Sequence, residues 1–483
     1  MTGGAAREPA GLAALLLALA CASVPEVEPP VEVPEAFSAP GALPRMDRWW
    51  VDLGDPALSL LIEEALRGSP DLATAWDRLA QARAVARREG ASLLPQVDAE
   101  SAAGSTWGDS FADPAAGVGQ RLDDFRLGLL LSWELDLFGR LRATRDAARY
   151  DAAASEAEVR FAAIALAGEV ASQWYGLVEQ SRQLALLEAQ IRTNEDVLQL
   201  VTMRFRAGQA GAADVLRQRQ LVEQRRGERE RVEAQAQVAV HALAVLLGRP
   251  PVEVALPPAE ALPVPGEVPE PGLPSELLER RPDVRRAYLD VLAADRRLAA
   301  ARADRLPRLS LSASSAFTSS DFADVLDNWM AAVAAGLVAP VLDGGRRRAE
   351  VDRTRAVLSE RIHAYGQVIL TSLQEVEDAL AQERQQRRLI ESLEAQLELA
   401  RQTLERLGDR YLKGATAYLD VLDALASQQT LERSLVTARR ELLEFRIDLH
   451  RAVAGGFPLE PPALATPGGG PRASAPPPPG AAP

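Results

Sequence analysis

Two aspartates one helical turn apart, Asp420 and Asp423, are the most conspicuous pair of chemically capable side chains in the sequence. They lie in the stretch YLDVLDALASQQ, and the polar positions continue along the same predicted helix face at Ser427 and Thr430. Such a pair can act as general acid and base when a pocket separates the two pKa values. Nothing in the neighbouring sequence indicates a substrate cleft. A solvated helix face, or a ring of charge built from several chains, are the alternatives.

The other reactive side chains form no recognisable catalytic or metal-binding set. His241, His363 and His450 each stand alone in a predicted helical segment, and we expect ordinary helix-face residues there. The sequence therefore predicts no enzyme, no cofactor and no metal site. With 68 acidic against 54 basic residues, the formal charge of -14 argues against nucleic acid as a partner.

The single cysteine, Cys21, directly follows an apolar run over residues 11–20. That run is too short to span a bilayer but suits the apolar region of a secretory signal. A cysteine at this place resembles a bacterial lipoprotein cleavage site. We therefore expect a signal peptide over residues 1–20 and a lipid-anchored segment over 21–55, with secretion without a lipid as the alternative.

An internal duplication supplies the elements that position the two aspartates. The segment RFRAGQAGAADVL, residues 204–216, returns as RYLKGATAYLDVL, residues 410–422, 206 residues later. An apolar heptad pattern typical of a coiled coil precedes each glycine-containing segment. Two repeats are expected, over 56–248 and 275–456. A proline-rich linker joins them over 249–274, and a disordered Pro/Gly/Ala tail follows over 457–483.

Each repeat has the same predicted order: a helix, two β-strands and a long helical hairpin. The clearest strand is FRLGLLLSWELDLF, in which apolar residues from Phe125 to Leu137 alternate with mostly polar ones, giving one apolar face. The expected strands are about 95–108, 122–138, 307–319 and 328–342, and the expected hairpins are about 140–247 and 345–454.

The fold class predicted from these elements is an α+β membrane protein that is completed by other copies of the chain. Four strands with an apolar outer face cannot close a barrel alone, because two edges would stay unpaired in lipid. Three copies would give twelve strands, within the range of membrane barrels, whereas two would give a narrow eight.

Five stretches in the same order resemble the outer-membrane factors of tripartite efflux pumps, the TolC-like family. They are RWWVDLGDPALSLLIEEALRGSPDL, WELDLFGRLR, APVLDGGRRRAEV and the paired glycine segments. Within the family the sequence is similar to the lipid-anchored branch that serves RND-type exporters. The resemblance implies a homotrimer in the Gram-negative outer membrane and its lipid, with a twelve-stranded barrel and a long periplasmic α-helical barrel. A periplasmic adaptor and an inner-membrane pump of RND type would pass drugs, metals or other small molecules into this passive duct.

The resemblance also assigns roles to individual residues. Asp420 and Asp423 would form carboxylate rings at the periplasmic gate, with Leu419 as an apolar collar. A hydrogen bond between Tyr411 and Asp214 would link neighbouring helix pairs.

Two further features concern the same end of the chain. Some members of the family carry an arginine where this chain has Thr416, so the charge-assisted part of the gate link is absent. Gly208 and Gly414 would form the hairpin tips that dock on the adaptor.

Two other functions share many of these features. An outer-membrane factor of an ABC-type exporter or type I protein secretion system would share nearly all of them. An exported coiled-coil structural protein would account for the heptads but not for the alternating strands at matching places in the two repeats.

Overall fold

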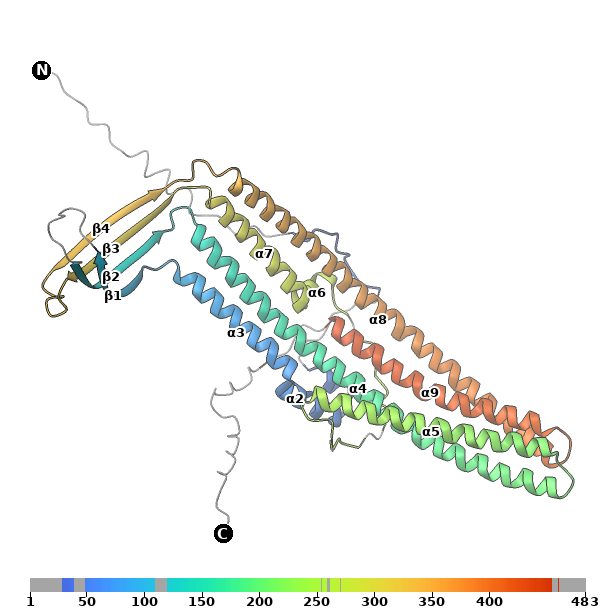
Figure 1. Ribbon diagram of the computed structural model, residues 1–483. Helices are drawn as coiled ribbons and strands as arrows, with labels where there is room; N and C mark the ends of the chain where they lie inside the picture. The colour runs from blue at the N-terminus through green and yellow to red at the C-terminus, as the bar shows by residue number, and fades with distance from the viewer. Residues whose placement is uncertain are drawn as a thin grey trace, which may run out of the picture.

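A computed structural model describes residues 28–38, 48–108, 120–252, 254–258, 261–269, 271–453 and 459. The described chain is elongated, with a β-sheet at one end and the turns of two helical hairpins at the other (Figure 1). The expected signal peptide, the lipidation site at Cys21 and nearly all of the tail over 457–483 lie outside the described residues.

The sheet has four antiparallel strands in the order β1-β2-β3-β4. Their bounds are β1 Gln96–Gly108, β2 Gln120–Leu135, β3 Arg308–Ser319 and β4 Trp329–Val338. β2 pairs with β3 and so joins the two repeats directly. In a single chain, β1 and β4 are the edges, and their outer backbone groups have no strand partner among the described residues.

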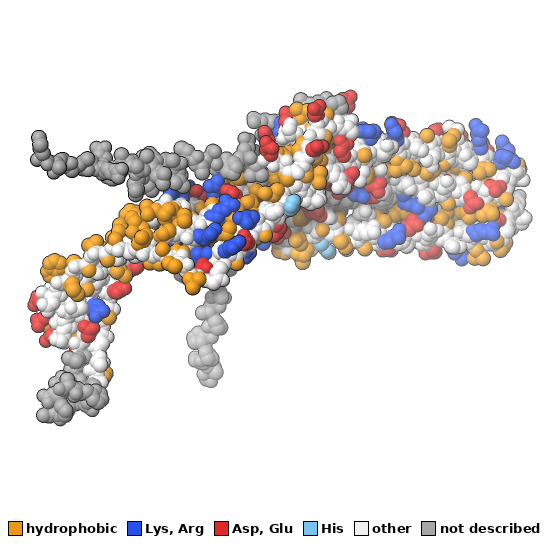
Figure 2. Space-filling model, turned by 90° about the horizontal axis from the view of Figure 1, so that it is seen from above, with side chains coloured by type: hydrophobic (Ala, Val, Ile, Leu, Met, Phe, Trp, Pro, Cys, Tyr) orange, Lys and Arg blue, Asp and Glu red, His pale blue; other side chains and the backbone are white. Residues whose placement is uncertain are grey.

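The pairing register gives this sheet two different faces. Leu127 pairs with Phe317, which pairs with Trp329, so these three side chains share one face with Leu129, Val333 and Leu337. Much of this apolar face is exposed, and Figure 2 shows hydrophobic side chains gathered on the sheet end of the molecule. The opposite face carries charged residues, including Asp98, Glu100 and Glu134. The alternation predicted from the sequence thus produces one apolar and one charged surface.

Two strands end earlier than expected, each for an identifiable reason. β2 ends at Leu135 and not at 138, because the Asp136 carboxylate accepts hydrogen bonds from the backbone N–H groups of Leu141 and Arg142, at 3.0 and 2.8 Å, at the start of the next helix. β4 ends at Val338 and not at 342. Pro340, two residues on, has no N–H to donate to a ladder.

The two longest helices, α4 Arg140–Arg206 and α8 Arg346–Leu412, each contain 67 residues. At about 1.5 Å per residue each is about 100 Å long. α5 Ala212–Leu246 returns along α4, and α9 Tyr418–Val453 returns along α8 (Figure 1). The shorter helices are η1 Trp49–Leu53, α2 Pro56–Gly68, α3 Pro70–Ala91, α6 Pro274–Arg280 and α7 Pro282–Ala303. In the described parts of the chain, no helix has the length and apolarity to cross a membrane.

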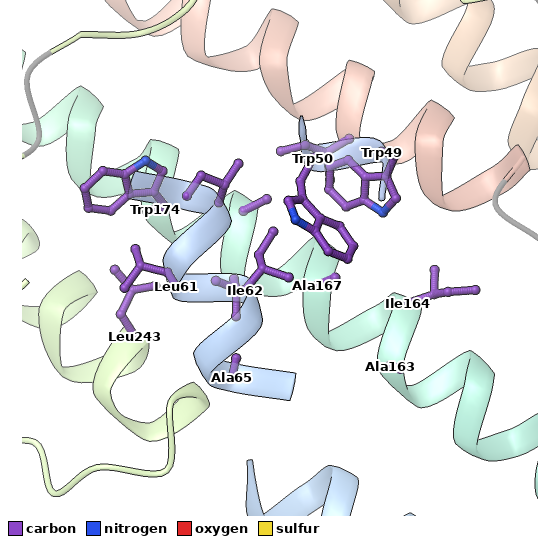
Figure 3. Packing of buried hydrophobic residues seen from close by; sticks show 14 of the residues in the cluster. Trp49, Trp50, Leu61, Ile62, Ala65, Ala163, Ile164, Ala167, Trp174 and Leu243 are labelled. Carbon is purple, nitrogen blue, oxygen red and sulfur yellow. The ribbon is translucent and has the colours of Figure 1, made fainter. Parts of the chain in front are cut away.

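The main hydrophobic core lies midway along the molecule, where η1 and α2 pack on α4, α5 and α9. Figure 3 shows Trp50 beside Ile62 and Ala167, with Trp49 next to Trp50. Asp55 stabilises this region through two sets of hydrogen bonds. Its carboxylate accepts from the backbone N–H groups that begin α2 and, at 2.8 Å, from the indole N–H of Trp174.

His450 was expected to lie on an ordinary helix face, and this expectation is wrong. Its ring is buried and stacks on Trp49 with centroids 5.3 Å apart and planes at 17°. Its Nε2 atom has no hydrogen-bond partner among the described residues. Burial, reinforced by the positive charge of Arg446, lowers the pKa of His450 to about 4, with Glu383 opposing the shift. His241 and His363 are exposed, as expected.

A buried ion pair attaches the linker between the repeats to the second hairpin. The Glu383 carboxylate is fully buried and accepts hydrogen bonds from Arg446, at 2.9 and 2.6 Å, and from Arg387, at 3.2 and 2.9 Å. Both guanidinium groups also donate to the Gly266 carbonyl, at 3.0 and 2.6 Å. The proline-rich segment is therefore held against α8 and α9 at this point.

Candidate gate at the hairpin tips

The two hairpin turns have the same backbone design in both repeats. Gly208 and Gly414 have φ values of 73° and 74°, the left-handed region that disfavours other residues. The N–H after each glycine, in Gln209 and Ala415, donates back to the carbonyl of the residue five positions earlier at 2.8 Å. A Cβ atom added to either glycine would meet no atom within 4 Å. The glycines are thus needed for backbone conformation, and the space around the two tips is open.

Asp420 and Asp423 lie on the exposed face of the first turns of α9, followed by the exposed Ser427 and Thr430. Thr416, in the turn, donates its hydroxyl to Asp420 at 2.6 Å. Thr416 thus contacts the first of the two aspartates through an uncharged hydroxyl donor.

Leu419 is also exposed, directly beside Asp420. The start of α9 therefore offers carboxylates and an apolar side chain outside the protomer's own packing.

Tyr411 and Asp214 lie near each other but do not form the expected hydrogen bond within the protomer. The buried Tyr411 hydroxyl has no partner among the described residues. Asp214 instead accepts the backbone N–H of Gly211 at 3.1 Å and lies 3.6 Å from Arg217. Burial raises the pKa of Tyr411. The nearby Arg204, whose guanidinium lies 4.5 Å from the ring centroid, opposes the rise, and Asp214 adds to it.

Sequence reasoning missed the residues that join the two hairpins beside these tips. Tyr418 packs against Tyr411 and Val201, and its hydroxyl donates to Gln218 of the other hairpin at 2.6 Å. The sequence contained one indication of this polar contact, which is Asn194, a polar residue within the apolar heptad pattern of the first repeat. It is completely buried.

Two further expectations concern sites away from the gate. In the part of the chain that the structure describes, no group of His, Cys, Asp and Glu side chains is placed to hold a metal ion.

The described part of the N-terminal segment lies along α7 and α8, with Val31 and Val33 packed beside Tyr365. The Ser38 N–H donates to Glu377 at 2.8 Å.

The fold defines a class of protein. A sheet with one apolar face and unpaired edges is continued by two helices of about 100 Å, each paired with a shorter returning helix, which is the subunit of a membrane-embedded duct. The outer membrane efflux protein family matches residues 61–249 and 273–455, and the chain belongs to that family.

Named relatives and a solved structure agree with this membership. The outer membrane protein OprJ of Pseudomonas aeruginosa is 34% identical over 93% of this chain and 97% of its own length. The pyoverdine export outer membrane protein OpmQ of the same organism is 32% identical over 86% of this chain and 89% of its own. The outer-membrane channel OprN has a TM-score of 0.82 at 27% identity, covering 90% of this chain and 99% of the other.

The protein is therefore an outer-membrane channel component of an efflux system in Gram-negative bacteria. Because its family consists of ducts, the alternative of an exported coiled-coil structural protein is rejected. The resemblance seen in the motifs is confirmed.

Proposed function

We propose that three copies of the chain close their sheets into a twelve-stranded barrel and their hairpins into a periplasmic duct. The sheet carries this proposal: strands β1 and β4 present unpaired edges, which cannot stay open in lipid. Twelve strands lie within the range of membrane barrels. The exposed apolar face would contact lipid, and the charged face that bears Asp98 and Glu100 would line the water-filled interior.

In this assembly the duct is passive and receives its cargo from an inner-membrane pump of RND type through a periplasmic adaptor. A relative named for pyoverdine export supports a small-molecule cargo. Drugs, metals and other small molecules are the cargo classes. The exposed turns at Gly208 and Gly414 would meet the adaptor, because open space around the glycines permits close approach of another backbone.

The gate lies at the start of α9. In a trimer Asp420 and Asp423 would supply six carboxylates to one constriction, with Leu419 as an apolar collar beside the first ring. Mutual repulsion of these charges is tolerable only with water and cations between them. The constriction would therefore attract cations, repel anions and bind multivalent cations. Tyr411 and Asp214 lie beside this gate, and a hydrogen bond between them in the closed trimer, which the single protomer does not form, would link neighbouring helix pairs.

Lipidation of Cys21 is consistent with the path of the described N-terminal segment. Pro30 lies so close to Gly366 of α8 that a Cβ there would be 3.1 Å from its Cγ. The nine residues from Cys21 to Pro30 can extend about 30 Å. Gly366 lies 20 residues into α8, about 30 Å from the end next to the sheet. A lipid on Cys21 can thus reach the level at which the barrel begins.

Conductance in a planar bilayer tests the duct and its gate together. The purified protein should be a trimer in detergent and should form a small, cation-selective channel that hexamminecobalt(III) blocks from the periplasmic side. Replacing both gate residues, Asp420→Ala with Asp423→Ala, should remove the block and much of the selectivity. Trimer stability should change little, because exposed charges contribute little to folding.

The control is Asp352→Ala, which removes an exposed carboxylate near the other end of α8 and should leave the block intact. A stable monomer would reject the architecture. Unaltered block and selectivity in the double variant would return the two aspartates to an ordinary solvated helix face.

A further inference from the structure

Five polar side chains are buried where the two hairpins of one chain meet, close to the tips. They come from α4, α5 and α9, and none is more than 4% exposed. They are Asn194, Gln218, Arg225, Tyr418 and Gln429. We refer to these five residues as the buried polar chain.

Hydrogen bonds connect the five without interruption. The Tyr418 hydroxyl donates to the Gln218 side-chain oxygen at 2.6 Å, and the Gln218 amide donates to the Asn194 backbone carbonyl at 2.7 Å and its side-chain oxygen at 3.2 Å. The Asn194 amide then donates to the Gln429 side-chain oxygen at 3.2 Å. Arg225 donates to that same oxygen at 3.1 Å.

The positive charge in this chain is balanced locally. Arg225 donates to both carboxylate oxygens of Glu228, at 3.0 and 2.9 Å. Every member of the buried polar chain therefore has a hydrogen-bond partner, and every hydrogen bond that it makes between helices is out of contact with water. Such a network is stable when complete and costly when one member is removed.

The hairpin fold itself does not require this network. In the second repeat, 206 residues later, the positions of the asparagine, the glutamine and the arginine are occupied by Ala400, Ala424 and Leu431. That repeat nevertheless forms a long helix of the same 67 residues and a returning partner. Where folding does not require buried polar groups, their best-attested role is to fix one register of two packed helices among several possible ones.

The buried polar chain lies next to the proposed gate, so the helix register that it fixes also determines the position of the gate residues. Tyr418 is the first residue of α9, two residues before Asp420 and five before Asp423. Fixing the Tyr418 hydroxyl on Gln218 therefore fixes where both gate carboxylates lie. Movement of the start of α9 away from the first hairpin must break this bond and admit water, which recovers part of the lost hydrogen-bond energy.

We propose that the buried polar chain is a latch that holds α9 against the first hairpin and so sets the closed position of the gate. This inference rests on the proposed duct and its gate at Asp420. It assigns a positioning role to the five residues of the buried polar chain, because all of them are buried within the protomer.

Open probability in single-channel recordings tests the latch. One variant transfers the residues of the second repeat into the first, Asn194→Ala with Gln218→Ala and Arg225→Leu, together with Tyr418→Phe. We expect a trimer with a lowered unfolding midpoint, because Gln429 stays buried without its two donors. The open probability should be higher by at least about tenfold, since more than one closed-state hydrogen bond of about 1 kcal/mol is lost. Block by hexamminecobalt(III) should persist in the open channel.

The conservative variant Tyr418→Phe removes a single hydroxyl and decides the question if the fourfold variant does not fold. It keeps the ring contact with Tyr411, and its open probability should rise by about fivefold. The control is Gln402→Ala, an exposed glutamine of α8 that bonds only within its own helix and should leave the open probability unchanged.

The two proposals fail in different ways. An unchanged open probability in trimeric latch variants, with wild-type conductance and block normal, would overturn the latch alone. An equal rise in the Gln402 control would also overturn it. If the wild type forms no cation-selective channel, the proposed gate and the latch are both overturned.

Discussion

Acid should destabilise this protein through one histidine far from the gate. His450 lies in the central core against Trp49, and its Nε2 has no hydrogen-bond partner in the described chain. Its pKa is 6.5 when solvated and about 4 in the fold. A group whose folded pKa is lowered binds a proton in the unfolded chain first, so stability is lost as pH falls from 6.5 towards 4.

The size of this loss follows from the two pKa values. At pH 5 the unfolded chain is almost fully protonated at His450 while the folded chain is mostly not, which costs about 2 kcal/mol per protomer. The loss levels off near 3 kcal/mol, at roughly the folded pKa and below. His450→Phe keeps a ring of similar size in the stack and removes the titration.

Denaturant unfolding followed by circular dichroism, at fixed protein concentration, measures the difference between pH 8 and pH 5 for both proteins. The wild type should lose about 2 kcal/mol more than His450→Phe over this interval. The carboxylates titrate in both proteins, so their contributions to the pH dependence cancel in the difference. The matched control is His363→Phe, at an exposed position of α8, which should keep the wild-type pH dependence. Parallel pH profiles for the wild type and His450→Phe would refute the burial argument.

Three more predictions concern the linker anchor, the tips and the N-terminus. Glu383→Ala should cost about 3–5 kcal/mol in denaturant unfolding, because the charge of Arg446 stays buried without its partner, and Glu383→Leu with Arg446→Met should recover most of it; a small loss in the single variant would contradict this. Gly208→Trp or Gly414→Trp should abolish crosslinking to the adaptor and efflux while leaving the trimer intact, and efflux that survives both changes would exclude the tips as the docking surface. Metabolic labelling with palmitate should mark the wild type but not Cys21→Ser, which should still assemble, whereas an unlabelled wild type would indicate secretion without a lipid.

Elements with a strong local period were visible in the sequence. Both long helices end two residues before the turn glycines Gly208 and Gly414, because apolar heptads and a glycine terminator are local signals. The strand alternation from Phe125 to Leu135 was equally clear, since one face must be apolar. Strand ends were less predictable, as the cap formed by Asp136 depends on a helix that follows it.

Contacts between distant segments were not visible. His450 is buried by Trp49, 401 residues earlier, and a lone histidine in a helical sequence carries no mark of such a partner. The bond from Tyr418 to Gln218 spans 200 residues. Only its three-dimensional setting separates a buried glutamine from the many exposed ones of a coiled-coil surface.

The equal lengths of α4 and α8 fix the distance between the sheet and the two hairpin turns. Two helices of 67 residues place both turns at one distance from the sheet, so the tips end level. Removing one heptad would shorten the span by about 10 Å while keeping the seam in phase. The same deletion would have to occur in α5 and α9, and in both repeats together, or the tips would end at different heights. A change in the length of this protein would therefore have to occur in four matched segments at once.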